Sequence, residues 1–190
     1  IGLVSYYFSE YYRIRKSVNL LHENFIVKLI SVLRYIDGES SLPGSSDHLL
    51  FEIMHYDFFD IEPLDIATLS VEMHAARKAG ETLLWRNKIQ TVSNDTDSKR
   101  AIRRLSDDIE YWVKNRYNIT LQQLVEKVIV RGGILSYIMW QPDKHWHLEM
   151  LNSFFSFIKS ECERNTRLDL TGLIKTLDLM EEENIELPLT

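Results

Sequence analysis

The sequence has few of the residues that build disulfide-bonded, turn-rich or membrane-spanning proteins. Its one cysteine, Cys162, excludes a disulfide within the chain and is typical of a reducing, intracellular environment. Seven glycines and four prolines are too few for the many turns of a β-sandwich or barrel. No run reaches the roughly 18 apolar residues of a membrane span, and no signal-peptide pattern opens the chain. We therefore expect a cytoplasmic protein with no membrane partner.

Motifs that bind nucleotides are also missing. The sequence has no Gly-x-x-x-x-Gly-Lys-Ser/Thr loop and no Gly-x-Gly-x-x-Gly motif. Its only glycine pair, Gly132 and Gly133, follows a predicted helix, whereas a phosphate-binding loop opens one. We predict no cofactor and no catalytic residue in these 190 residues.

The composition favours one sizeable folded domain or two small lobes. Hydrophobic residues make up 45% of the chain, enough for a core. The formal net charge of −6 argues against a general nucleic-acid coat protein, which needs a basic surface, although a local basic patch is compatible with it. The chain begins at Ile1 without an initiator methionine and stops at Thr190 without a charged tail. We interpret it as part of a longer protein; a processed mature chain would look the same.

Apolar residues recur at helical spacing along most of the chain and predict an all-α fold. Residues 1–19 fit either an extended segment or a helical turn, because tyrosines dominate them. Loops are expected at 38–46 and 92–98, which are rich in Gly, Ser, Asn and Asp. The expected helical segments are 24–36, 47–54, 63–77, 82–85, one around 102–113, 121–131, a short turn at 134–140, 148–164 and 168–183.

Local signals predict where several of these helices begin. Asp47 or a neighbouring serine is expected to cap one helix, and Pro63 fits the first turn of the next. Thr120 and Gln123 match a capping box. Between the helices on either side of residue 60, the aromatic sequence Phe58-Phe59 predicts a buried corner in place of a polar loop.

The histidines invite a metal-binding interpretation, which we do not favour. His145, His147 and Glu149 would align in an extended segment, but on a helix the two rings point to different faces. We therefore predict no metal site.

Two other sites have side chains that occur in active sites, but they lack the neighbouring residues that catalysis requires. His55 lies near Asp57 and Asp60, but no nucleophile accompanies it, so we predict a packing role. Cys162 has acidic neighbours and no cation to lower its pKa, so we predict an unreactive thiol.

Two groups of basic residues are the candidate DNA-binding side chains. The first lies near the N-terminus, and the second follows helical spacing on one side of a predicted helix. An alternative for the second is a solvated face with the ion pairs Arg103–Asp107 and Arg104–Asp108. The candidates are Arg13, Arg15, Lys16, Lys99, Arg100, Arg103 and Arg104.

Several segments, taken in order, resemble the accessory subdomain (2B) that is inserted in superfamily 1 DNA helicases of the UvrD/Rep type. Each motif is mostly apolar helix, and the resemblance rests on their order and spacing over nearly the whole chain. The segments are 18–21, 25–26, 33–35, the corner 58–69, Thr82-Leu-Leu-Trp85, 121–135, 148–155 and 170–177.

The resemblance implies an irregular multi-helix module inserted in a RecA-like motor domain. Residues 1–19 would connect it to the motor, 20–187 would form it, and 188–190 would begin the return. It would be non-catalytic, with ATP and Mg²⁺ bound by the parent helicase, which acts in DNA repair or recombination. The implied partners are DNA through the parent, the motor domains of the same chain, and a nuclease subunit.

One departure from the family lies at the corner, where UvrD, Rep and PcrA have a Gly-Ile-Gly turn that approaches duplex phosphate. This chain has Asp60-Ile61-Glu62, whose two carboxylates hinder and repel a phosphate. In this respect it is closer to the AddA/RecB-like branch. Two other hypotheses remain open: a free-standing helical protein-interaction module, and a metal-dependent hydrolase that uses the histidines.

Overall fold

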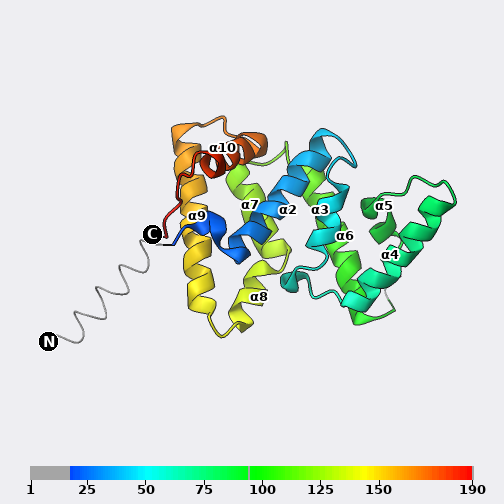
Figure 1. Cartoon of the computed structure of the whole chain (residues 1–190). Coiled ribbons are helices and arrows are strands. Elements are labelled where there is room, and N and C mark those ends of the chain that lie inside the picture. Colours follow the sequence, from blue (N-terminus) through cyan, green and yellow to red (C-terminus); the bar gives the residue numbers. More distant parts are fainter. Residues whose placement is uncertain (1–17, 94, 190) are drawn as a thin grey trace.

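Helices build the part of the chain that the structure describes, as predicted. The computed structural model describes residues 18–93 and 95–189, and within these ranges it contains no β-strand (Figure 1). The elements are η1 (Leu20–His22), α2 (Asn24–Ser41), α3 (Asp47–Ile53), η2 (Asp57–Phe59), α4 (Pro63–Lys78), α5 (Trp85–Gln90), α6 (Asp97–Asn115), α7 (Leu121–Arg131), α8 (Ile134–Trp140), α9 (Lys144–Arg164) and α10 (Leu170–Glu182).

Helix α2 is the centre of the fold. It packs against α3, α6, α9 and α10, and its apolar residues are buried on more than one face. Leu29, Leu33 and Ile36 are fully buried there, and Trp112 of α6 is the largest fully buried side chain. Figure 1 shows α9 and α10 at one end of the molecule and α4 with α5 at the other, with α6 running between the two groups.

The predicted corner is confirmed. Phe58 and Phe59 form the short helix η2 and are buried, and Ile61 packs against the core from a half-buried position. Asp60 ends η2 in the left-handed conformation, with φ 54°. Pro63 then opens α4 at its first turn, as its fixed φ and missing N–H predict.

The prediction of a loop at 38–46 is wrong for residues 38–41, because α2 continues to Ser41. Gly38 lies inside this helix, where it permits close packing. A Cβ at position 38 would lie 1.9 Å from the Oγ of Ser46. The hydroxyl of Ser40 donates to the carbonyl of Ile36, so the polar residues remain inside the helix. Residues 42–46 alone form the loop.

Two expectations about helix starts are also wrong. Residues 82–84 are not helical, and α5 begins at Trp85. Neither Ser46 nor Asp47 caps α3 through its side chain. Asp47 instead accepts the N–H of Trp85 at 2.7 Å, and thereby fixes the start of α5 from a distant part of the chain.

Other starts follow local signals. The capping box of Thr120 and Gln123 is present at α7, and Asp169 caps α10. Thr96 caps α6, so this helix begins inside the segment that we expected to be loop. The expected turn at 134–140 is the helix α8, and α9 begins at Lys144, four residues before the predicted position.

The two ends of the described chain meet. Asn19 and Pro188 form an isolated antiparallel bridge. The N–H of Leu20 donates to the carbonyl of Leu187 at 2.8 Å, and the N–H of Leu187 donates to the Asn19 side chain at 3.0 Å. None of the helices in residues 18–93 and 95–189 is long and apolar enough to cross a membrane.

Candidate functional site

A hollow of about 500 Å³ lies where η2, α6 and the α7–α8 turn meet. We call it the corner hollow. It brings together Asp60, from the altered family corner, and Arg104, from the second basic group. These two residues are far apart in the sequence, and sequence reasoning did not connect them. The corner hollow therefore brings together described candidates of both kinds.

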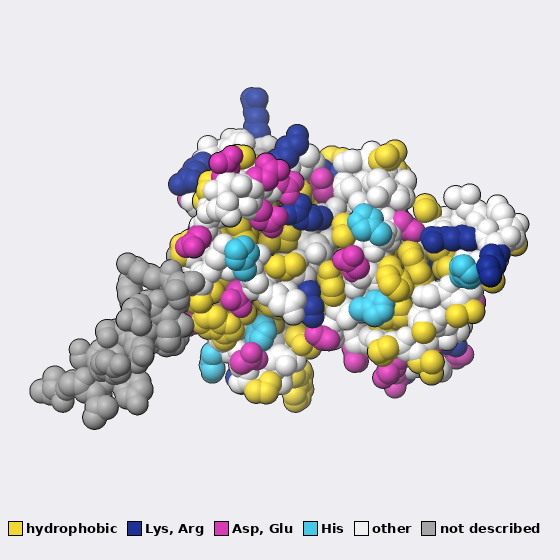
Figure 2. Space-filling view, in the orientation of Figure 1, with side chains coloured by type: hydrophobic (Ala, Val, Ile, Leu, Met, Phe, Trp, Pro, Cys, Tyr) yellow, Lys and Arg dark blue, Asp and Glu magenta, His cyan; other side chains and the backbone are white. Residues whose placement is uncertain are grey.

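Aromatic side chains form much of the wall. Phe58 and Phe59 contribute from η2, and Tyr137 and Trp140 contribute from α8. Trp140 is 88% exposed, which is unusual for so large an apolar side chain. Figure 2 shows hydrophobic side chains beside acidic ones at the lower edge of the molecule, where α8 and the start of α9 lie. An exposed tryptophan at the edge of a hollow is a typical anchor for a partner.

The turn between α7 and α8 needs both of its glycines. A Cβ at Gly132 would lie 2.5 Å from the Val128 carbonyl and 3.2 Å from the Trp112 ring. Gly133 has φ 76°, which favours glycine. The predicted break at this pair is confirmed, and it turns α8 back so that Tyr137 and Trp140 line the corner hollow.

A buried carboxylate forms the floor of the corner hollow. Asp108 is 4% exposed and pairs with Nε of Arg131 at 2.5 Å. Burial raises the pKa of Asp108 from 3.8 to about 6, although the charges of Arg131 and Arg104 oppose this shift. The partner of Asp108 is therefore Arg131 of α7, and the Arg104–Asp108 ion pair that we predicted does not form. Arg104 acts on this carboxylate only through its charge.

The other members of the second basic group pair with nearby residues. Lys99 lies 3.2 Å from Asp95, Arg100 pairs with Asp97, and Arg103 lies 3.6 Å from Asp107. Arg103 also donates to the carbonyl of Gln90. The predicted Arg103–Asp107 pair is confirmed. Only Arg104 of this group lines the corner hollow. Ile61 and Glu62 do not line it; they line a neighbouring hollow at the start of α4, which shares Asp57 and Asp60 with the corner hollow.

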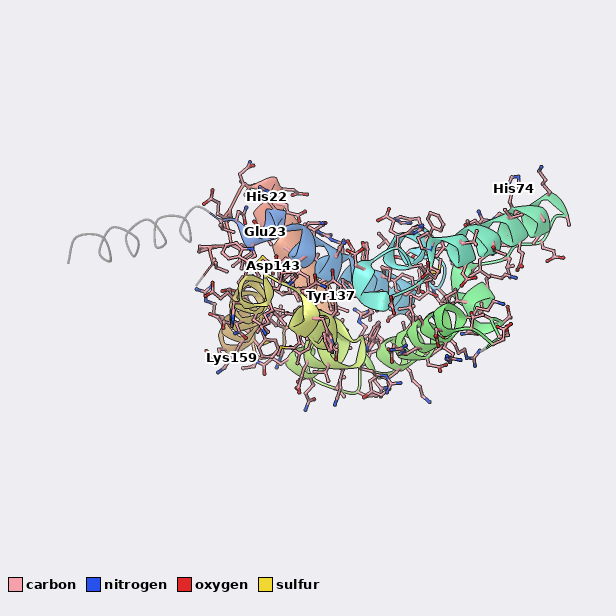
Figure 3. The ribbon with its side chains drawn as sticks, turned by 90° about the horizontal axis from the view of Figure 1, so that it is seen from below. His22, Glu23, His74, Tyr137, Asp143 and Lys159 are labelled. Atoms are coloured by element: carbon pink, nitrogen blue, oxygen red, sulfur yellow. The ribbon has the colours of Figure 1, made fainter. Side chains whose placement is uncertain are left out.

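A second, smaller hollow of about 220 Å³ adjoins the first, and the two share Asp57, Phe58 and Tyr137. We call it the side hollow. Its other polar lining residues include Glu23, Lys28, Asp143 and His147. Figure 3 shows Glu23 and Asp143 close together, with Tyr137 of α8 farther away.

Most of these groups have partners. Lys28 lies 2.9 Å from Asp57, and His147 lies 3.1 Å from Asp143. The pKa of Tyr137 is raised by burial and then by the carboxylates of Asp57 and Asp143.

The histidines have structural contacts. His145 and His147 lie in the first turn of α9, ahead of the helix start that we predicted, and the His147 ring packs edge-on against Phe25 with centroids 5.1 Å apart. His55 is exposed and contacts the Phe51 carbonyl at 2.8 Å and the Phe51 ring, so its packing role stays a prediction. Within residues 18–93 and 95–189, no three His, Cys, Asp or Glu side chains are grouped to hold a metal ion. Burial raises the pKa of the Cys162 thiol, in agreement with its predicted low reactivity.

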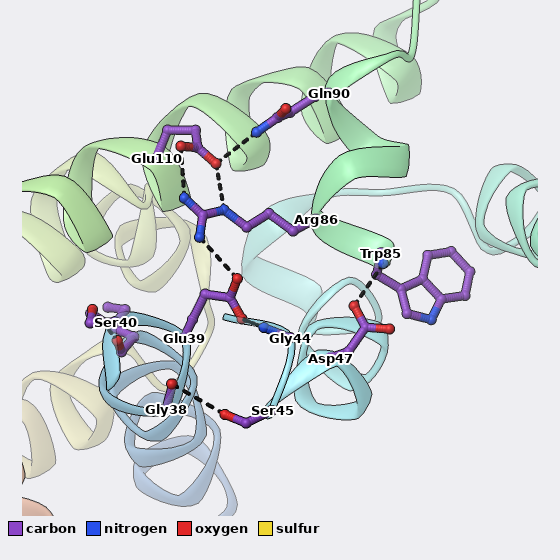
Figure 4. Close-up of polar contacts among 11 residues, drawn as sticks. Gly38, Glu39, Ser40, Gly44, Ser45, Asp47, Trp85, Arg86, Gln90 and Glu110 are labelled. Carbon is purple, nitrogen blue, oxygen red and sulfur yellow. Dashed lines mark hydrogen bonds and ion pairs between the residues drawn. The ribbon is translucent and has the colours of Figure 1, made fainter. Parts of the chain in front are cut away.

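A partly buried ion-pair network joins three helices in a way that the sequence did not indicate (Figure 4). Arg86 of α5 donates to Glu110 of α6 through Nε and Nη2, at 2.6 and 2.8 Å, and to Glu39 of α2 through Nη1, at 2.9 Å. Glu39 is 3% exposed and also accepts the N–H of Gly44. Arg86 lowers the pKa of Glu110. Because these contacts join the protein's own helices, we infer that they stabilise the fold and do not form part of a binding site.

The first basic group, Arg13, Arg15 and Lys16, lies outside the described residues. Sequence reasoning missed Asp108, Arg131, Tyr137 and Trp140 as parts of a site, and only the Gly132-Gly133 break pointed to this region. The sequence matches no protein-family model and no curated protein.

Proposed function

We propose that this chain is a non-catalytic accessory module, inserted in an ATP-dependent DNA helicase of repair or recombination, that modulates unwinding through contacts with DNA or a partner. The observation that carries the proposal is the meeting of Asn19 with Pro188. A module that is inserted in another domain must leave and rejoin its host at one place.

The contacts at this junction suit an insertion. The side chain of Asn19 accepts from the N–H of Leu21 at 3.1 Å and from that of Leu187 at 3.0 Å, so one residue joins both ends. Leu187 and Leu189 are buried, and the helices between the ends enclose their own core. Domains with adjacent ends and a separate core tolerate insertion into a host.

The helical architecture and the order of the family-like segments also support the proposal. In this function the motor domains of the host would bind ATP and Mg²⁺, and the module would supply a surface. The carboxylate of Asp60 at the corner disfavours close approach of a phosphate. We therefore propose that this corner contacts a partner or another part of the host more readily than duplex DNA.

The coding sequence on both sides tests the proposal first. We expect a Gly-x-x-x-x-Gly-Lys-Ser/Thr motif upstream and a further helicase motif soon downstream. The isolated chain should hydrolyse no ATP, with or without DNA. A gene without motor motifs, or ATP hydrolysis by the isolated chain that survives repurification, would contradict the proposal.

A second candidate function is a free-standing protein-interaction module. The exposed Trp140 and the 52% exposed Met139 on α8 favour it, because such side chains are enriched where proteins bind each other. The same flanking sequence distinguishes the two functions.

A further inference from the structure

We infer that the corner hollow and the side hollow together form a docking strip for a basic, extended segment of a partner polypeptide. The two hollows meet over Phe58 and Tyr137, which line both. The strip would serve a helicase insert and a free-standing module alike, so it does not depend on the choice between them.

Charge is the first reason. Five carboxylates line the strip, against the cations Lys28 and Arg104 and the histidine His147. The carboxylates are Glu23, Asp57, Asp60, Asp108 and Asp143.

Three of these carboxylates have partners within the protein: Asp57 pairs with Lys28, Asp108 with Arg131, and Asp143 with His147. The other two, Glu23 in the side hollow and Asp60 in the corner hollow, form no ion pair with another residue in 18–93 or 95–189. Each hollow therefore offers one carboxylate to a cation from outside. In the side hollow a phosphate chain would meet repulsion, whereas in the corner hollow Asp60 competes with Arg104, which forms no ion pair among the described residues.

The aromatic wall is the second reason. Guanidinium and ammonium groups bind carboxylates, and they also bind the faces of Trp and Tyr rings. The protein already pairs its own cations with rings near the strip: Lys28 lies 5.6 Å from the Tyr56 ring centroid, and Arg131 lies 4.5 Å from that of Tyr111. The exposed ring of Trp140 at the rim offers the same surface to a partner.

The shape of the strip selects the form of the partner. Two separate hollows, of about 500 and 220 Å³, accept two side chains from one segment more readily than one compact ligand. An extended segment with two Arg or Lys residues and an intervening apolar residue would place one cation in each hollow. The apolar residue would then lie over Phe58 and Tyr137. The net charge of −6 assists the approach of such a segment.

Asp60 provides a sharp test, because asparagine adopts its left-handed conformation readily. Asp60→Asn therefore removes the charge and keeps the turn. Glu163→Gln is the matched control: it removes one exposed carboxylate near the C-terminal end of α9, whereas the strip uses the N-terminal end of this helix. Trp140→Ala tests the aromatic rim.

The experiment is an NMR titration of the ¹⁵N-labelled full chain with the peptide Ac-Arg-Ala-Leu-Ala-Arg-NH₂, whose two Arg side chains and central Leu share one face of an extended chain. Its acidic counterpart, with Glu in place of Arg, and the oligonucleotide dT15 are titrated in parallel. We expect the basic peptide to shift the Trp140 indole and Tyr137 amide signals, with an affinity that falls as salt is added. Asp60→Asn and Trp140→Ala should each weaken binding at least about threefold, and Glu163→Gln should not.

Three results would overturn the inference: no shift at these signals with the basic peptide, equal binding of the acidic peptide, or stronger binding of dT15 at the same signals. Equal affinities of the Asp60→Asn and Glu163→Gln variants would also overturn it. The helicase proposal would survive all of these results, because it rests on the meeting of Asn19 with Pro188.

Discussion

Asp108 of α6 and Arg131 of α7 form an ion pair at the floor of the corner hollow, with Oδ1 and Nε 2.5 Å apart. Only 6% of the Asp108 side chain is exposed, whereas 44% of the Arg131 side chain is. The pair therefore has one buried and one hydrated partner. Because the cost of burying the carboxylate exceeds the attraction of the guanidinium, the pKa of Asp108 rises to about 6.

This raised pKa predicts a pH dependence of stability. The unfolded carboxyl titrates near 3.8 and the folded one near 6, so the folded state binds the proton more tightly. Protonation of Asp108 therefore contributes to the free energy of unfolding fully below about pH 4. This contribution, up to about 3 kcal/mol, is lost as the pH rises through about 6. Urea unfolding of wild type and Asp108→Asn between pH 4 and 7 measures it. The stability of the variant relative to wild type should rise across this range; a constant difference would contradict the shift.

Removal of Arg86 should destabilise the fold strongly. Arg86→Ala would leave Glu39, 3% exposed, without its cation, and we expect a loss of about 3–5 kcal/mol in the free energy of unfolding. The double variant Arg86→Ala/Glu39→Gln should recover part of this loss, because no buried charge remains unpaired. Chemical denaturation at pH 7 measures all three proteins. A loss below about 1 kcal/mol, or no recovery, would show that the network contributes little.

Gly38→Ala should destabilise the protein, although alanine is the better helix former. Its Cβ would lie 1.9 Å from the Ser46 Oγ, and we expect the displacement of the 42–46 loop to cost about 1–3 kcal/mol. Ser46→Gly in the same chain should restore most of this loss. The midpoint of urea unfolding is the measurement. An increase in stability of about 1 kcal/mol, which is the helix-propensity advantage of alanine over glycine, would show that the 42–46 loop moves aside without destabilising the protein.

Asn19→Ala should loosen the junction between residues 19–21 and 187–188. The variant loses the acceptor for the N–H groups of Leu21 and Leu187, and we expect a local cost of about 1–2 kcal/mol. Hydrogen exchange at the Leu187 amide should accelerate, whereas Asn19→Asp, which keeps an acceptor oxygen, should remain close to wild type. Unchanged protection of Leu187 in Asn19→Ala would mean that this side chain does not hold the ends together.

Local signals in the sequence predicted the fold well where a residue acts on its own neighbours. Pro63, the Thr120–Gln123 capping box and the Gly132-Gly133 break all depend on a few consecutive residues, and all are found as predicted. The apolar periodicity likewise identified the helices of the core.

The errors arose where a residue acts on a distant segment. Gly38 resembled a helix breaker, but its role is to admit Ser46. Asp47 resembled a cap for its own helix, but it binds the N–H of Trp85. The same limit applies to the candidate site: Asp60, Arg104 and Trp140 come together only after α6 and α8 pack against the corner. Sequence spacing carries no signal for such contacts.

The proposed role is tested most directly in the full-length protein, by removing residues 20–187 and joining Asn19 to Pro188, which already lie side by side. DNA-stimulated ATP hydrolysis and the rate of duplex unwinding are measured for both forms. If the chain is an inserted accessory module, the shortened protein keeps DNA-stimulated ATP hydrolysis and unwinds duplex at a changed rate. Loss of ATP hydrolysis in a protein that remains folded, or an unchanged unwinding rate, would contradict this account.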